Sequence, residues 1–170
     1  MDLDDLNVLV DYHYWARDRM LEAVAALTPE QYTKDLGNSF GSVRDTILHA
    51  YFAEWVWYSR WVGTSPNLWP SVEPFPDVPA IRAAWAAHES KVRAFLGSLG
   101  EKDIDRRFDY QLMNGQPGQS VLWHMLQHVV NHATYHRGQV TTMLRQLGAA
   151  PPKSQDLIVF YRERHANQAS

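Results

Sequence analysis

The sequence predicts an all-α protein, a four-helix bundle formed by a single domain over residues 1–170. Four segments repeat their apolar residues at helical spacing, and stretches with Pro or Gly separate them without an internal repeat or an obvious linker. Helices with one apolar face bury that face most simply against each other. Ligand sites in bundles are built from side chains on facing helices, so histidines on apolar faces are the first candidates for a site.

The first helix is predicted from Leu3 to Leu27, because apolar residues recur there three or four positions apart and Thr28-Pro29 closes the pattern. His13 lies on the apolar stripe of this helix. A single histidine in such a place is more often a core residue than a metal ligand. Residues 28–41 are polar and turn-rich, which is typical of a connection.

The second helix is predicted from Val43 to about Trp61, after a capping box formed by Ser42 and Asp45. It carries His49 and is apolar and aromatic nearly all the way round. Periodicity therefore does not identify its innermost side, and we expect it to be covered on more than one side.

Residues 63–79 contain five prolines and predict a surface loop, long enough for an overhand connection in a bundle. The third helix is predicted from Ala80 to Leu99, with His88 on its apolar stripe. Residues 101–119 alternate charged and aromatic residues around Asn114-Gly115, a hairpin signal.

The fourth helix, from about residue 121 to 147, carries His124, His128, His132 and His136 four positions apart. Ser120 or Gln119 is predicted to cap it, and the segment from Leu157 to Tyr161 is predicted as a short strand or turn. At about 100° per residue the four imidazoles form a slow spiral. His132 and His136 fall inside the apolar face, His128 on its margin and His124 toward solvent.

The buried pair of histidines favours a metal site. Two unpartnered imidazoles in an apolar core cost free energy, whereas His residues at i and i+4 can bind one ion at about 2.0–2.1 Å. The alternative is two core histidines that bond to carbonyls or carboxylates. A third ligand is expected from His49, His13 or His88, on the facing helices.

Composition restricts the chemistry further. The chain has no cysteine, which excludes disulfides, thiolate zinc sites and a protein thiol nucleophile. A net charge of −3 without a Lys/Arg cluster argues against a nucleic-acid partner. No stretch approaches a membrane span, and residues 1–10 are too acidic for a signal peptide, so we expect a cytoplasmic protein without membrane contact. Seven Trp and eight Tyr could line an aromatic cavity.

Three motifs carry a resemblance to a known family. They are Y-H-Y-W-A-R-D-R-M-L at residues 12–21, S-F-G-S-V-R-D-T-I-L-H at 39–49 and N-H-A-T-Y-H-R-G-Q at 131–139. Together they resemble the DinB/YfiT-like metalloenzymes over nearly the whole chain. The resemblance implies an up-down-down-up bundle whose metal is bound by His49, His132 and His136. It also explains Gly138, because an interior glycine suggests close backbone packing.

The resemblance implies an enzyme that uses a divalent metal, with Zn or Ni favoured over Fe, Co or Cu. Characterised members transfer or isomerise groups with a low-molecular-weight thiol, and metal-assisted hydrolysis of a small molecule is the close variant. The alternative is a non-catalytic, stress-related protein that binds a metal or ligand. Di-iron carboxylate sites and H-E-x-x-H proteolysis lack their motifs here, and haem has no specific support.

Four further residues are candidates for the pocket or for supporting the metal ligands. These are His128, His13, Glu54 and Tyr135. Arg137 is expected to form a structural ion pair. The aromatic excess of the second helix also predicts a homodimer, since it exceeds what one small core readily covers.

Overall fold

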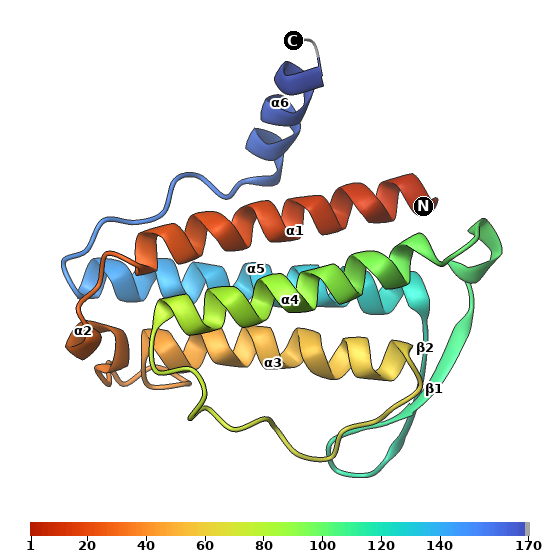
Figure 1. The fold of residues 1–170 in the computed structure, drawn as a ribbon, viewed down its shortest axis with the longest axis horizontal. Helices are drawn as coiled ribbons and strands as arrows, with labels where there is room; N and C mark the ends of the chain where they lie inside the picture. Colours follow the sequence, from red (N-terminus) through yellow and green to blue (C-terminus); the bar gives the residue numbers. More distant parts are fainter. Residues whose placement is uncertain (169–170) are drawn as a thin grey trace.

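Four long helices form the body of the computed structural model, which describes residues 1–168 (Figure 1). They are α1 (Leu3–Val24), α3 (Val43–Trp61), α4 (Val78–Gly97) and α5 (Leu122–Gln146). Figure 1 shows α1 and α5 running in one direction and α3 and α4 in the other. The predicted up-down-down-up four-helix bundle is therefore confirmed. α5 makes its most extensive helix contacts with α3 and α1, so it packs against both of them.

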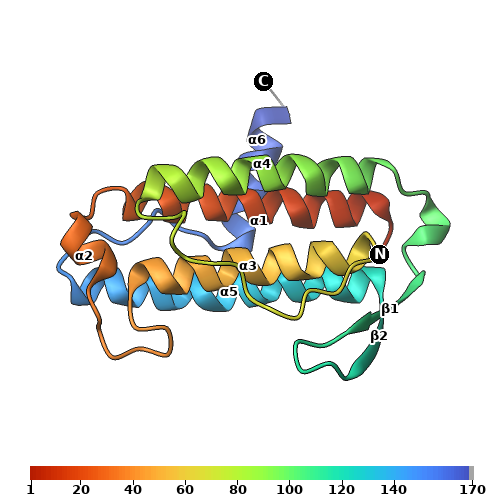
Figure 2. The ribbon, with the colours of Figure 1, turned by 60° about the horizontal axis from the view of Figure 1, so that its bottom comes forward.

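The connection between α3 and α4 explains the parallel direction of these two helices. Residues 62–77 run back along the length of the bundle, as Figure 2 shows, and so return the chain to the end where α3 began. Prolines lack a backbone donor and fix φ, so this segment cannot join a helix or a sheet. It keeps an extended path over the surface instead.

Side-chain caps fix the starts of the helices. The Asp2 side chain accepts a hydrogen bond from the Asp5 amide and begins α1. Ser42 does the same for α3 through the Asp45 amide, while the Asp45 carboxylate bonds the Ser42 hydroxyl instead of its backbone amide. A short helix, α2 (Pro29–Thr33), lies in the connection after α1 and is capped by Thr28. Its proline at the first position suits a helix start, because the missing amide hydrogen is not needed there.

The predicted hairpin is present as β1 (Arg107–Gln111) and β2 (Pro117–Val121), preceded by a 3₁₀ turn, η1 (Glu101–Asp103). Gly115 adopts φ 81° in its turn, a conformation that glycine allows at little cost. The predicted caps of α5 were wrong. Ser120 and Gln119 are engaged in the hairpin, where they bond to Tyr110 and Asp109.

The first amides of α5 find backbone partners instead. The amides of Leu122 and Trp123 donate to the carbonyls of Arg106 and Ile104, at 3.0 and 3.3 Å. The hairpin thus leads directly into the histidine helix, and carbonyls just before β1 accept the hydrogen bonds that a capping side chain would otherwise accept.

The prediction of a strand or turn at residues 157–161 was wrong, because this segment begins a helix, α6 (Leu157–Gln168). Its aromatic and β-branched composition suggests a strand, but a strand needs a partner, and the hairpin lies at another part of the fold (Figure 1). Phe160 instead packs against Tyr12 and Trp15 of α1, with ring centroids 5.7 and 5.5 Å apart. Arg19 of α1 pairs with Glu163 at 2.7 Å, so both an apolar contact and an ion pair hold α6 to α1.

None of the helices in residues 1–168 has both the length and the apolar character needed to cross a lipid bilayer.

Candidate metal centre

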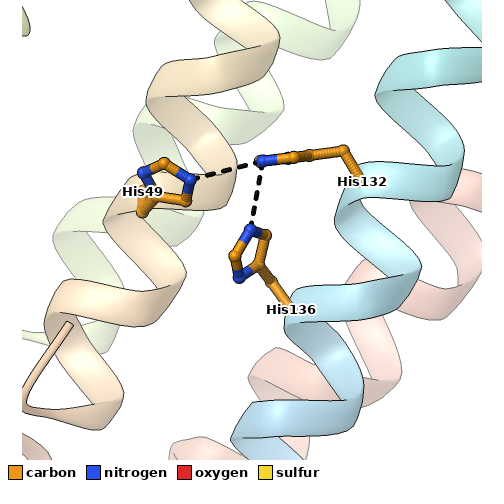
Figure 3. A group of neighbouring side chains, drawn as sticks. All are labelled: His49, His132 and His136. Atoms are coloured by element: carbon orange, nitrogen blue, oxygen red, sulfur yellow. Dashed lines mark hydrogen bonds between the residues drawn. The ribbon is translucent and has the colours of Figure 1, made fainter. Parts of the chain in front are cut away.

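Three histidines from two helices converge at one point between α3 and α5 (Figure 3). The Nε2 atom of His132 lies 3.3 Å from Nε2 of His49 and 3.1 Å from Nε2 of His136. All three ligand atoms lie within 4.8 Å of one another. Two imidazole nitrogens bound tetrahedrally to one zinc ion would lie about 3.3 Å apart, so the observed separations fit a shared ion.

The exposure of the histidines on α5 follows the predicted spiral. His136 is buried, His132 is intermediate, and His128 and His124 are exposed. His49 on α3 is also intermediate. The cluster is thus closed on the side of the core and reachable from the outside, which is the arrangement that a binding site needs.

Gln139 orients His136. The Nδ1 atom of His136 lies 2.7 Å from the side-chain oxygen of Gln139, which accepts and does not donate. The hydrogen of the neutral ring therefore sits on Nδ1, and Nε2 keeps its lone pair directed at the other two histidines. A hydrogen bond of this kind to the remote nitrogen is the usual support of a metal-binding histidine. Sequence analysis did not single out Gln139, although its i+3 position relative to His136 was a signal.

Two of the three imidazoles are held in the neutral form. Burial and the neighbouring His136 lower the pKa of His49 to about 4, and burial with the same neighbour lowers the pKa of His132 to about 4. Burial also lowers the pKa of His136. Neutral imidazole is the form that binds a metal ion, so the protein presents these rings ready to bind at neutral pH.

This electrostatic arrangement predicts an unusual pH dependence. An ordinary histidine would release a metal as the pH falls through about 6.5, where protons begin to compete for the ring. Because the pKa values of His49 and His132 are lowered, protons compete only at lower pH, and the midpoint of zinc release should lie well below 6.5. Equilibrium dialysis against zinc at a series of pH values measures that midpoint. Release centred at 6.5 would contradict the prediction.

Aromatic side chains surround the histidine cluster. Phe40 stacks on the His49 ring with centroids 4.0 Å apart, and Trp69 lies 5.5 Å from the same ring. Of the predicted pocket candidates, Tyr135 is exposed and its ring lies 5.2 Å from that of His136. The ring of His128 lies 5.7 Å from that of His132. Both candidates therefore border the cluster on its exposed side.

Glu54 and His13, the other two candidates, lie in a separate buried cluster. The Glu54 carboxylate accepts from Tyr14 at 2.7 Å and from Trp85 at 2.6 Å, and it lies 3.0 Å from Nε2 of His13. Nε2 of His88 lies 3.8 Å from the same carboxylate. The third histidine of the metal centre is thus His49, while His13 and His88 face Glu54.

Arg137 does not form the predicted ion pair among the described residues. It is buried and donates to Tyr12 and Thr134, at 3.2 and 2.6 Å, while its Nε and Nη1 atoms have no hydrogen-bond partner within residues 1–168. It lines a cavity of about 1040 Å³ between α5 and residues 151–158, and none of the three clustered histidines lines that cavity. The close packing predicted at Gly138 was also wrong, since a Cβ atom there would meet nothing within 4 Å.

The chain is similar to proteins of one family in both sequence and fold. A model of the DinB family matches residues 3–163. "Protein DinB" of Bacillus subtilis (strain 168) is 26% identical over 159 residues, which cover 89% of this chain and 92% of that protein. The crystal structure of a DinB-like protein from Bacillus cereus ATCC 10987 superposes with a TM-score of 0.61 at 19% identity, covering 86% of this chain and 95% of that one.

Proposed function

The chain belongs to the DinB family, and from that premise and the histidine geometry we propose that it is a divalent-metal-dependent enzyme. The reaction is the transfer or isomerisation of a group on a small molecule with a low-molecular-weight thiol, and metal-dependent hydrolysis is the close variant. The observation that carries the proposal is the convergence of three Nε2 atoms, one of which has its lone pair fixed by Gln139.

The donor set supports an open metal site. His49, His132 and His136 would hold the ion, and a divalent ion needs at least one ligand more than these three. The further position would be left to water or substrate. Zinc and nickel suit neutral imidazole ligands best in this proposal, with iron, cobalt and copper as alternatives. An ion with an open position supplies Lewis acidity and lowers the pKa of a bound thiol or water.

The side chains beside the cluster support thiol chemistry. The chain has no cysteine, so a thiol nucleophile has to arrive with a cofactor or substrate. His128 is the candidate to accept the proton of that thiol. Its ring borders His132, and burial together with the charge of Arg60 lowers its pKa, so the ring is neutral and has a free nitrogen at neutral pH. Tyr135, exposed beside His136, is placed to contact the substrate.

The alternative proposal is a non-catalytic metal- or ligand-binding protein. A fourth protein ligand that closes the coordination shell would favour it. The residues weighed for that role are Glu54, His13 and His128. Glu54 and His13 direct polar atoms at each other instead, and His128 lies outside the three-histidine group. This arrangement supports the enzyme over the alternative.

Metal analysis followed by turnover assays tests the proposal. Protein expressed without a polyhistidine tag should contain close to one divalent ion per chain. Paired assays of low-molecular-weight thiols with small electrophiles should then show turnover that a chelator abolishes and added metal restores. Tightly bound metal without turnover on any thiol pair or hydrolysable ester would support the binding-protein alternative, and protein that binds no divalent ion would refute the enzyme and any metal-binding role.

We also propose that the protein forms a homodimer. The exposed apolar residues of α6, Leu157, Ile158 and Tyr161, would be covered by a second copy of the chain. Light scattering on concentrated protein should give twice the chain mass, and Ile158→Glu should shift it to one chain. The equivalent change at Val62, an exposed residue remote from α6 in sequence, should leave the dimer intact. A monomeric mass for the unmodified protein would contradict the proposal.

A further inference from the structure

A second cavity, distinct from the one beside Arg137, lies next to Trp69, whose ring neighbours His49 of the histidine cluster. It has a volume of about 360 Å³ and lies between α3 and the connection from α3 to α4. α3 contributes Tyr51, Phe52 and Trp55 to its walls, and the connection contributes Trp69 and Phe75 among others. A cavity of about 150 Å³ is large enough to hold benzene, so this one has room for a larger apolar group.

Trp69 links the cavity to the candidate metal centre. It is one of the cavity walls, and its ring also lies 5.5 Å from the ring of His49. Figure 3 shows His49 on α3 pointing toward the two histidines of α5. A molecule in the cavity that reaches past Trp69 would therefore arrive at the His49 side of the cluster.

The walls of the cavity select for uncharged apolar groups. Every lining residue is aromatic, aliphatic or proline, and the single titratable group is the Tyr51 phenol. A phenol is uncharged at neutral pH, so no charged side chain lines the cavity. A charged group placed here would lose its hydration without gaining a partner, whereas an aromatic ring would gain contact with several other rings.

The wall that the connection contributes to the cavity contains large apolar side chains that are exposed to solvent. Leu68 is 76% exposed and Trp69 is 47% exposed, although both are large apolar residues. Leu68 lies two positions after Pro66, and Trp69 directly precedes Pro70. These two prolines limit the conformations of the free loop. Ordering such a wall on a ligand costs less conformational entropy than ordering a flexible loop.

We propose that this cavity binds the uncharged aryl or branched alkyl end of the substrate, whose polar end reaches the metal centre. The substrate class is thus an amphiphilic small molecule, with an apolar group attached to the metal-directed functional group. The inference rests on the proposed metal-dependent function, and it assigns specificity to Trp55 and Trp69, which no motif of the sequence had marked.

Two hydroxamates test the inference, because they share one metal-binding group and differ only in their tail. Acetohydroxamate carries a methyl group and benzohydroxamate a phenyl ring. On zinc-loaded protein, calorimetric titration should show that benzohydroxamate binds about 10- to 50-fold more tightly, as expected from burial of the ring. Trp55→Ala should reduce that preference to about 3-fold or less and leave acetohydroxamate affinity unchanged. Trp123→Ala, a half-buried tryptophan on α5 that does not line the cavity, is the matched control and should keep the preference.

A metal-free measurement separates failure of the cavity from failure of the metal centre. The uncharged dye N-phenyl-1-naphthylamine fluoresces in apolar surroundings, and it should bind the metal-free protein and the His132→Ala variant alike, but bind Trp55→Ala several-fold more weakly. Dye binding without acetohydroxamate binding would refute the open metal site, while the cavity would still be a ligand-binding site. Acetohydroxamate binding without a phenyl preference, or a preference that Trp55→Ala leaves intact, would overturn the inference.

Discussion

Replacing His132 with alanine should abolish stoichiometric metal binding and lower zinc affinity at least a hundredfold. The Nε2 atom of His132 lies within 3.3 Å of the Nε2 atoms of both other histidines. Its loss leaves only two imidazole nitrogens to bind the ion. Two imidazoles hold a labile divalent ion far more weakly than three. Competition with a zinc-sensitive dye gives the affinity, and mass spectrometric metal analysis gives the occupancy. His49→Ala and His136→Ala should behave in the same way.

His124→Ala is the matched control for this prediction. His124 lies on the same helix but is exposed and stands outside the three-histidine group. Its replacement should change neither metal content nor melting temperature. All variants should fold, because apolar packing between the helices stabilises the bundle, although the metal-free forms should melt at lower temperature by mass action. Full occupancy in His132→Ala together with loss in His124→Ala would refute the assignment.

Replacing Glu54 with alanine should destabilise the protein by about 3–5 kcal/mol, the usual cost of removing one partner from a buried charged network. The carboxylate is 2% exposed and is the common acceptor of Tyr14 and Trp85. Burial by itself raises the pKa of Glu54, but His13, His88 and the Tyr14 hydrogen bond together outweigh burial and hold the pKa well below its ordinary value. Without this acceptor, buried donors from α1 and α4 lose their partner at once.

Urea unfolding followed by circular dichroism measures the loss. Tyr14→Phe removes one donor and keeps the carboxylate, so it should cost only about 1 kcal/mol. Glu163→Ala removes a surface carboxylate that pairs with Arg19, and it should lower the stability far less than Glu54→Ala because exposed ion pairs contribute little. A Glu54→Ala variant as stable as Glu163→Ala would show that the cluster does not hold α1, α3 and α4 together.

Local signals in the sequence predicted most of the fold. The start of α3 followed from Ser42, and the hairpin followed from Asn114-Gly115, because caps and tight turns depend on residues next to one another. α6 was not predicted, because its residues 157–161 have the composition of a strand and only contact with Tyr12 and Trp15 of α1 favours the helix. The composition of a short segment holds no information about its contacts with residues more than a hundred positions away.

In the candidate site, too, local features could be predicted from the sequence and long-range contacts could not. The turn of the helix placed His132 and His136 on one face, since that depends only on helical spacing. α3 is apolar nearly all the way round, so its periodicity could not predict which way His49 faces. The assignment of His49 as a metal ligand depended on the family resemblance. The cluster around Glu54 gathers residues from three helices, and helix periodicity in one segment contains no information on which polar side chains meet across the core.

The position of α5 in the chain determines when folding can take place during synthesis. α1 and α3 leave the ribosome long before α5, yet each has its most extensive helix contacts with α5. Until residues 122–146 have emerged, the apolar faces of α1 and α3 lack the helix that covers them most extensively, and a nascent chain of that length is prone to aggregation. His49 likewise waits for His132, 83 residues later, before the cluster exists. We therefore expect the bundle to fold as a unit only after α5 has emerged, with any metal entering last.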